Sequence, residues 1–407
     1  MKRRVVITGM GVITSLGRGV DVTTKALKEG HSSIRRINSF DPSSHKTTLG
    51  GEVDPLQFEN FSAGDMDVRL WDRSSKLLFI ATFDALMSAG LQSSENHPIR
   101  VPFIAGTTLG GMLASQNFHR AAITGKNYKD RAPFVSDALA THQLLHVSEA
   151  LRILGETLIL NNACASSLSA VGLAYERIRA GDCDIAITGG YEVMSDFTHA
   201  GFNVLQLVTS DACRPFDKGR TGLVLGEGAG VLVIETLEHA LLRKASVIAE
   251  IIGYGQASDA YHLTKPDPNA LGASRAIMAA VDQAEIDPDA IDYVNAHGTG
   301  TPSNDSMEAK ALHFALGVHA SKVPISSTKP FMGHLLGAAG VVETIISVIA
   351  IQEQMAPENL NLHELDSECE LNVIRGGAQN LPIKTVLSNS FGFGGSNAAI
   401  LVKRFIG

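Results

Sequence analysis

The sequence alternates short apolar runs, rich in β-branched residues, with longer segments of helical periodicity. "RRVVITGMG", "VPFIAGTTLGG" and "TLILNNA" each predict a strand that ends in a turn of small residues. After Cys164, apolar residues recur every three or four positions as far as Ile178, Gly181 offers a helix stop, and "CDIAITGG" is the next strand. Strand–helix–strand units of this kind predict a parallel sheet covered by helices.

A second series of the same kind begins near the middle of the chain. It holds the strand "IDYVNAHGTG", a helix over 303–316, the strand "KVPISSTK", an apolar helix over 338–352, and a final strand pair in "KTVLSNSFGFGGSNAAILVKRF". No Pro- or Ser-rich linker separates the two series. The sequence therefore predicts two duplicated α/β halves, over 1–245 and 246–407.

The composition narrows the class of protein. Hydrophobic residues make up 44% and charged residues 19% of the 407 residues, which is typical of a compact globular chain. The net charge of −8 argues against a general nucleic-acid binder. The basic N-terminus precedes an apolar run that is broken by Thr8 and Gly9, with no cleavage signal close behind, and the most apolar segment carries Glu343. We expect a soluble cytoplasmic protein with no membrane span.

The most distinctive cysteine is Cys164, in "LILNNACASSLSAVG". A helix that begins just after it would direct free N–H groups and a positive dipole end at the sulfur, which favours a nucleophilic thiolate. The alternative is that Cys164 is a small core residue, as free cysteines often are. The other cysteines, at 183, 213 and 369, show no C-x-x-C or zinc-finger spacing and fit that second interpretation.

Two histidines and a lysine lie at predicted strand ends in the second half. His297 stands in the loop "NAHGTGTPSND", and Lys329 and His334 stand in "STKPFMGHLLGAAG". A histidine in a glycine-rich loop at the end of a strand is typical of a functional site. Metal binding is the competing interpretation, but neither loop offers a second ligand at the spacing that zinc needs. We expect no metal and no cofactor.

The motifs "NACASS", "HGTGTPSND", "KPFMGHLLGAAG" and "NSFGFGGSN", in this order and spacing, resemble those of the β-ketoacyl-acyl-carrier-protein synthases, most closely the elongating type II enzymes. "CRPFDKGRTGLVLGEGAGVLVIE" and the opening "RRVVITGMGVITSLG" are similar to the same family, so the likeness extends over almost the whole chain. The resemblance implies a thiolase-like fold, with the two halves stacked as α-β-α-β-α layers, and a homodimer.

The resemblance also implies a reaction, a decarboxylative Claisen condensation between malonyl-carrier protein and an acyl group in fatty-acid elongation. Cys164 would hold the acyl group as a thioester. His297 and His334, as neutral imidazoles, would stabilise the enolate that forms as carbon dioxide leaves. The backbone N–H groups of Cys164 and Phe393 would hold the second oxyanion, and Phe393 would also gate access to the cysteine.

The remaining residues receive supporting roles by the same resemblance. Lys329, paired with Glu343, would set the charge and orientation around His334, and Asp305 would support the site. Thr299 and Thr301 match positions that hydrogen-bond the pantetheine arm, and Leu109 falls where the family lines the acyl pocket. These roles are expectations that follow from the family alone.

The chain departs from the family pattern at several positions. Pro330 stands where type II synthases commonly carry serine, Thr221 stands where an acidic residue is usual, and "CASS" replaces the more usual sequence after the cysteine. These changes leave the chemistry intact but open the choice of substrate. A synthase dedicated to a type II polyketide or polyene pathway, alone or paired with a chain-length subunit, is the alternative to fatty-acid elongation.

Other enzyme classes fit less well. A degradative thiolase would need a second cysteine in a glycine-rich motif, whereas Cys369 lies in "DSECELN". An initiating synthase would pair its cysteine with one histidine and an asparagine, and a non-catalytic partner would lack the cysteine. The glycines of "TGMGVITSLG" do not fit the dinucleotide-binding pattern G-x-G-x-x-G.

The carrier protein is normally acidic, so we expect a basic docking patch near the entrance to the site. The candidates form two groups, which are Lys126, Lys129 and Arg131, and Arg69, Arg73 and Lys76.

Overall fold

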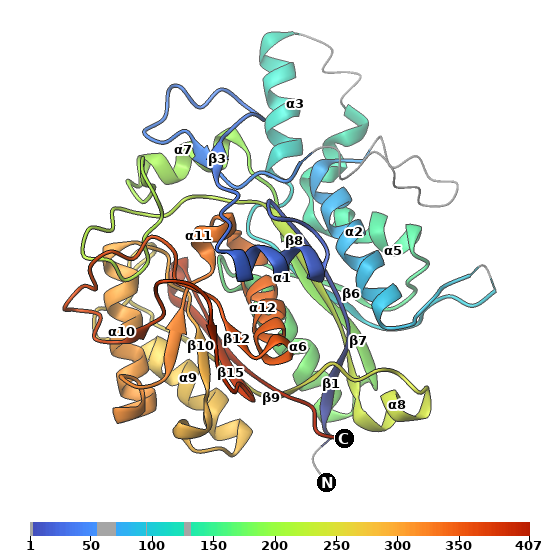
Figure 1. The fold of residues 1–407 in the computed structure, drawn as a ribbon. Helices are drawn as coiled ribbons and strands as arrows, with labels where there is room; N and C mark the ends of the chain where they lie inside the picture. Colours follow the sequence, from blue (N-terminus) through green and yellow to red (C-terminus); the bar gives the residue numbers. More distant parts are fainter. Residues whose placement is uncertain (1–2, 55–70, 95, 126–131) are drawn as a thin grey trace.

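The structure is a computed structural model that describes residues 3–54, 71–94, 96–125 and 132–407 (Figure 1). Its largest sheet has twelve strands, and β1 (Val5–Thr14) and β9 (Ala249–Ser258) lie at its middle. The other main strands of the first half are β5 (Phe103–Gly106), β6 (Thr157–Leu160), β7 (Ile185–Glu192) and β8 (Gly228–Thr236). Those of the second half are β10 (Tyr293–Asn295), β11 (Pro324–Ser326), β15 (Thr385–Gly392) and β16 (Ser396–Lys403).

The strand order is repeated between the two halves. From the middle outward the first half reads β1, β8, β7, β5, β6, and the second reads β9, β16, β15, β10, β11. Matching pairs also run in matching directions, because β5 is parallel to β6 and β7, as β10 is to β11 and β15. The antiparallel pair β1 and β9 joins the halves. The predicted α/β architecture is confirmed, whereas the boundary at residue 245 stays a prediction.

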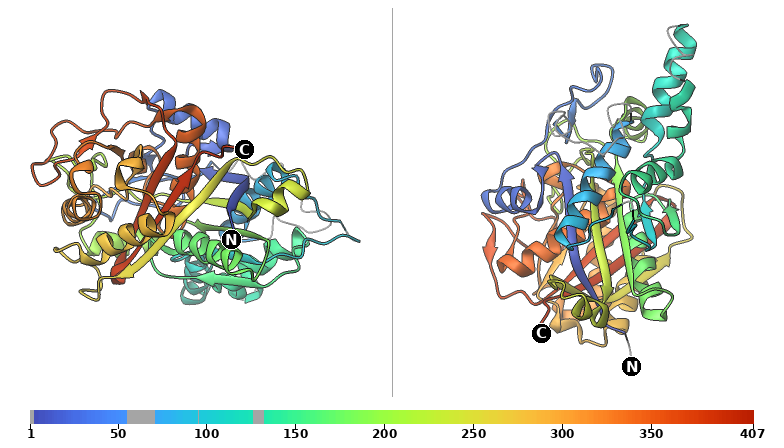
Figure 2. Two further views of the ribbon diagram at one scale, coloured as in Figure 1. Left: turned by 90° about the horizontal axis from the view of Figure 1, so that it is seen from below. Right: turned by 90° about the vertical axis from the view of Figure 1, so that its right-hand side faces the viewer.

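Helices cover both sides of the strands (Figure 2). In the first half they are α1 (Val20–Glu29), α2 (Arg73–Ser88), α3 (Met112–Thr124), α5 (Ala140–Ala150), α6 (Ser166–Ala180), α7 (Asp196–Val204) and α8 (Leu237–Leu242). In the second half they are α9 (Leu271–Ala284), α10 (Pro302–Leu316), α11 (Lys329–Met332) and α12 (Ala339–Glu353). The predicted helices over 303–316 and 338–352 therefore exist, and α6 ends at Gly181 with φ 91° as its sequence indicates.

The remaining strands have two residues each. They are β2 (Gly17–Arg18), β3 (Arg35–Arg36), β4 (Leu49–Gly50), β12 (Met355–Ala356), β13 (Asn372–Val373) and β14 (Gln379–Asn380).

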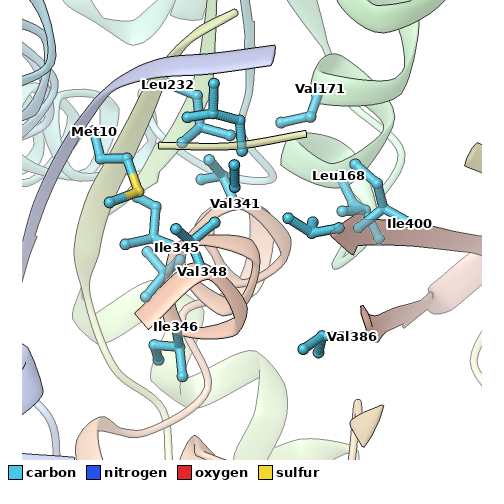
Figure 3. Packing of buried hydrophobic residues seen from close by; sticks show 14 of the residues in the cluster. Met10, Leu168, Val171, Leu232, Val341, Ile345, Ile346, Val348, Val386 and Ile400 are labelled. Carbon is cyan, nitrogen blue, oxygen red and sulfur yellow. The ribbon is translucent and has the colours of Figure 1, made fainter. Parts of the chain in front are cut away.

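The central helices α6 and α12 contact each other in the middle of the molecule (Figure 1). Side chains of α12 such as Val341 and Ile345 pack among Leu168 of α6, Met10 of β1 and Leu232 of β8 (Figure 3). Both halves therefore contribute to one apolar cluster. This packing fixes the ends of α6 and α12, where the candidate residues lie.

One segment is more apolar than we expected from the sequence. Leu336–Glu353 is long and apolar enough to cross a membrane by length and composition, although no such window was predicted. In the structure 89% of this segment is buried, because α12 is the central core helix. Its hydrophobicity is thus accounted for by packing inside the protein.

Candidate active site

Cys164 lies in a tight turn between β6 and α6. The preceding Ala163 has φ 54°, a left-handed conformation that costs free energy for a residue with a Cβ. The hydroxyl of Ser166 closes the turn, because it accepts the Asn162 N–H at 3.0 Å and donates to the Ala163 carbonyl at 2.6 Å. Gly106 of β5 packs directly beneath, where a Cβ would lie 2.3 Å from the carbonyl carbon of Ser166. The turn holds Cys164 rigidly at the start of α6.

The ionisation state of Cys164 differs from the sequence-based expectation. Burial raises the pKa of its thiol to about 12, although the positive charge of Lys329 acts in the opposite direction. The side chain is only 6% exposed. The prediction of a resting thiolate was wrong, because desolvation outweighs the favourable groups around the sulfur. A nucleophilic Cys164 would therefore need a neighbouring group that accepts the thiol proton.

His334 is in hydrogen-bond contact with the Cys164 sulfur. Its Nε2 lies 3.1 Å from the Sγ of Cys164. The loop that carries His334 is fixed on both sides, because the His334 N–H donates to the Val224 carbonyl at 2.7 Å and the Gly226 N–H donates to the His334 carbonyl at 3.0 Å. The segment "GLVLGEG" thus aligns the histidine with the cysteine of the other half.

His297 faces His334 across the site. The two rings are perpendicular, with centroids 5.3 Å apart. The His297 N–H and the Gly298 N–H donate to the two carboxylate oxygens of Glu308, at 2.8 and 2.7 Å. Glu308 is fully buried on α10, and burial raises its pKa to about 7. Our sequence analysis missed this residue, whose only signal was an acidic side chain on a helix that follows a histidine loop.

Both imidazoles are held in the neutral state. Burial, together with the positive charge of Lys329, lowers the pKa of His297 and of His334 well below the ordinary value of 6.5. The Lys329 Nζ lies 2.5 Å from Glu343 Oε1, and both side chains are buried. Burial raises the pKa of Glu343 to about 7, while Lys329 acts to lower it. This electrostatic arrangement agrees with the neutral hydrogen-bonding histidines that the family resemblance implies.

A cavity of about 230 Å³ brings most of the candidate residues together. Its lining includes Cys164, His297, His334, Thr299, Thr301 and Phe393. The hydroxyls of Thr299 and Thr301 are 2.8 Å apart. The Phe393 ring stacks on Phe202 of α7, with centroids 5.7 Å apart, and the Phe393 backbone acts to lower the pKa of the Cys164 thiol. An apolar cavity with a few convergent polar groups is the form that small-molecule sites take.

Asp305 and Leu109 do not line this cavity. The Asp305 carboxylate accepts the N–H groups of Phe216 and Gly300, at 2.8 and 3.2 Å, so it fixes the backbone beneath the threonine loop. Leu109 is half-buried, and its N–H donates to Glu192 at 2.9 Å. Among the described residues, no group of three His, Cys, Asp or Glu side chains could hold a metal ion.

The docking candidates have mixed outcomes. Arg73 was wrongly proposed, because its guanidinium is committed to an ion pair at 2.5 Å with Glu227, which is buried. Lys76 is half-buried on α2. Arg69, Lys126, Lys129 and Arg131 lie outside the described residues.

Comparison with known proteins identifies the family. Residues 2–240 match the family described as beta-ketoacyl synthase, N-terminal domain, and residues 248–363 match its C-terminal domain. The chain is 39% identical over 416 residues to 3-oxoacyl-(acyl-carrier-protein) synthase 2 of Coxiella burnetii, with 99% of each chain covered. The protein of that name from Staphylococcus aureus strain COL is 39% identical over 415 residues, again with 99% of each chain covered.

Comparison with solved structures points to the same family. The ishigamide ketosynthase/chain length factor aligns with a TM-score of 0.92 at 32% identity, and a beta-ketoacyl synthase from Burkholderia phymatum aligns with 0.87 at 33%; both alignments cover 100% of each chain. A type II polyketide ketosynthase in complex with its acyl-carrier protein aligns over the same extent with a TM-score of 0.90 at 27% identity. These neighbours confirm the predicted thiolase-like ketosynthase fold. The chain belongs to the β-ketoacyl synthase family and is an acyltransferase.

Proposed function

We propose that the protein condenses malonyl-carrier protein with an acyl group held on Cys164, and releases carbon dioxide and β-ketoacyl-carrier protein. One observation carries this proposal. The Nε2 of His334 lies 3.1 Å from the Cys164 sulfur, with His297 beside it in the same cavity. A thiol and two neutral histidines in one apolar cavity suit a reaction that needs a good leaving group and hydrogen-bond donors for an enolate.

Acylation comes first. His334 Nε2 accepts the thiol proton while the Cys164 sulfur attacks the thioester carbonyl of the acyl-carrier protein. The N–H groups of Cys164 and Phe393 stabilise the oxyanion, and the carrier thiol leaves with the proton. Gly392 makes room for this approach, since a Cβ there would lie 3.0 Å from the Cys164 nitrogen.

Decarboxylation and condensation follow. His297 and His334 donate from Nε2 to the thioester oxygen of malonyl-carrier protein and stabilise the enolate as carbon dioxide leaves. The enolate carbon attacks the acyl-cysteine carbonyl, the Cys164 thiolate leaves, and it takes up one proton from solvent. His334 Nε2 thus accepts in one step and donates in the next. The Nδ1 of each ring has no hydrogen-bond partner in the described part of the chain, so no partner fixes one tautomer.

Fatty-acid elongation is the pathway that the sequence relatives favour, since the proteins with 39% identity are named 3-oxoacyl-acyl-carrier-protein synthases. The second candidate is a specialised polyketide or polyene pathway in which a chain-length subunit is the partner. It is favoured by the TM-score of 0.92 to a ketosynthase/chain length factor, a value above the 0.87 for the Burkholderia phymatum synthase. Both candidates use the same chemistry and differ in the acyl chain.

We also propose a cytoplasmic homodimer whose substrates are carried by an acidic acyl-carrier protein. The strand β6 supports the dimer, because it forms one edge of the large sheet and its residues are only half-buried. A partner that pairs with this edge would cover its free backbone groups.

A condensation assay tests the function and separates the two pathways. The purified protein is incubated with malonyl-carrier protein and a series of saturated or polyunsaturated acyl-carrier proteins, and the product is identified by its mass on the carrier. Extension of saturated chains by two carbons is expected for fatty-acid elongation. Extension of polyunsaturated chains only, or only after a chain-length subunit is added, would favour the second candidate. No extension under any of these conditions would contradict the proposal.

A further inference from the structure

Glu192 is a buried carboxylate that the proposed reaction does not use. It is the last residue of β7 and is 0% exposed. Its Oε1 accepts the Leu109 N–H at 2.9 Å and the Thr107 hydroxyl at 3.3 Å. Its Oε2 accepts the Thr108 N–H at 2.8 Å and the Gly337 N–H at 3.0 Å. The described residues supply no ion pair to this carboxylate, so neutral donors alone hold it.

These donors come from both halves of the protein. Residues 107–109 follow β5 in the first half, whereas Gly337 lies three positions after His334 in the second. The contact between the two segments is tight, because a Cβ on Gly337 would lie 2.4 Å from the Thr108 nitrogen. The Thr107 N–H also donates to the Leu160 carbonyl of β6, which leads into the Cys164 turn. A single carboxylate therefore links the segments that carry the cysteine and the histidine.

We propose that Glu192 is a positioning residue that fixes His334 relative to Cys164. The proposal rests on the function proposed above and adds a residue to it. Glu308 does the corresponding work for His297 by accepting two N–H groups of its loop. A buried carboxylate thus accepts backbone N–H groups from each histidine loop. Glu192 differs from Glu308 because it accepts N–H groups from both halves of the protein.

A carboxylate at this position has an electrostatic effect as well. The pKa of the Cys164 thiol depends mainly on burial and on the positive charge of Lys329, and next on Glu192. The negative charge of Glu192 raises this pKa. The other charged or titratable groups that act on the sulfur are Glu343, by charge, and His334, by contact. None of these groups is changed by a substitution at Glu192. The variant Glu192→Gln should therefore shift the pH dependence of Cys164 reactivity toward lower pH.

The test compares Glu192→Gln with wild type and with a control, Glu235→Gln. Glu235 is also 0% exposed, but it binds Arg243 and His239 and does not line the cavity that holds Cys164, His297 and His334. Three quantities are measured for each protein, which are the unfolding temperature, the rate of malonyl-carrier decarboxylation, and the pH profile of Cys164 alkylation by iodoacetamide.

We expect Glu192→Gln to fold and to lose about tenfold to a hundredfold in decarboxylation, because an amide cannot accept from all four donors and the His334 loop shifts. Its alkylation profile moves to lower pH, whereas Glu235→Gln keeps the wild-type profile and rate. Glu192→Gln with wild-type decarboxylation and an unshifted profile would overturn the proposal. If Glu192→Gln does not fold, Gly337→Ala is the second variant, because its added Cβ separates the same two segments. We expect Gly337→Ala to lose decarboxylation to a similar extent. Wild-type decarboxylation in Gly337→Ala would overturn the proposal too. A wild-type protein without decarboxylation would instead contradict the proposed function, and the alkylation profiles would still test the role of Glu192.

Discussion

The two halves of the molecule share one strand order but carry different groups at the ends of equivalent strands. In the first half, β6 ends in the rigid turn of Cys164 and the helix α6. In the second half, the equivalent β11 leads to Lys329 and the loop of His334. The two strands run in opposite directions, because five antiparallel pairings lead from β7 to β15. The groups meet because the loops that carry them precede α6 and α12, which contact each other. In the proposed function, one half supplies the nucleophile and the other supplies the hydrogen-bond donors for the enolate.

The largest expected effect separates the two halves functionally. Cys164→Ala should lower condensation by at least about four orders of magnitude, because no nucleophile remains to carry the acyl group. Malonyl-carrier decarboxylation should continue, since the second half keeps both histidines. Parallel assays of carbon dioxide release and β-ketoacyl product measure this separation. Loss of both activities in a folded variant would show that the halves do not divide the reaction in this way.

His334→Ala tests the contribution of the second half. It should lower decarboxylation by about 10² to 10³, as expected for the loss of one donor to a developing oxyanion. Carbon dioxide release from malonyl-carrier protein measures the effect, with circular dichroism as a check on folding. A variant that releases carbon dioxide at the wild-type rate would exclude His334 from this step.

A smaller effect is expected from Glu308→Gln, which leaves His297 in place but weakens the support of its loop. One of the two N–H groups loses its acceptor, and we expect a loss of about 1–3 kcal/mol in unfolding free energy and about tenfold in decarboxylation. Glu370→Gln is the matched control, because Glu370 lies in the same half and is exposed. Equal effects of the two substitutions would contradict the supporting role of Glu308.

The smallest expected change concerns protonation. Since the pKa of His297 and of His334 lies well below 6.5, both rings should stay neutral as the pH falls from 8 to 6.5. Below pH 6.5 each histidine binds a proton in the unfolded chain but not in the folded protein. The contribution of each histidine to the unfolding free energy therefore decreases as the pH falls below 6.5. Nitrogen-15 NMR of histidine-labelled protein, assigned with His297→Ala and His334→Ala, measures this directly. Protonation of either ring with a midpoint at or above 6.5 would be inconsistent with the buried, neutral site.

The sequence predicted the strand–helix alternation, the duplication and the principal groups of the site, because each follows from local patterns. "NACASS" and the two glycine-rich histidine loops stand at strand ends, where periodicity changes. The supporting carboxylates Glu192 and Glu308 could not be predicted in the same way. Their roles depend on burial and on donors distant in sequence, such as Gly337 for Glu192, 145 residues away.

The pKa of the Cys164 thiol also depends on packing between residues that are distant in the sequence. The start of a helix after Cys164 was correctly expected, and it favours a thiolate. The opposing desolvation comes from side chains of both halves, among them Phe202 and Leu336, which pack with Cys164 in one apolar cluster. A local pattern reveals the helix but not the packing around it, so the direction of the pKa shift was predicted wrongly.

We propose that Cys164 carries the acyl group, and the mass of the intact protein tests this role. Wild type and Cys164→Ala are each incubated with a series of acyl-carrier proteins and measured by mass spectrometry. We predict a mass increase of one acyl chain on wild type and none on the variant. An equal increase on both proteins, or none on wild type with any chain, would contradict the claim.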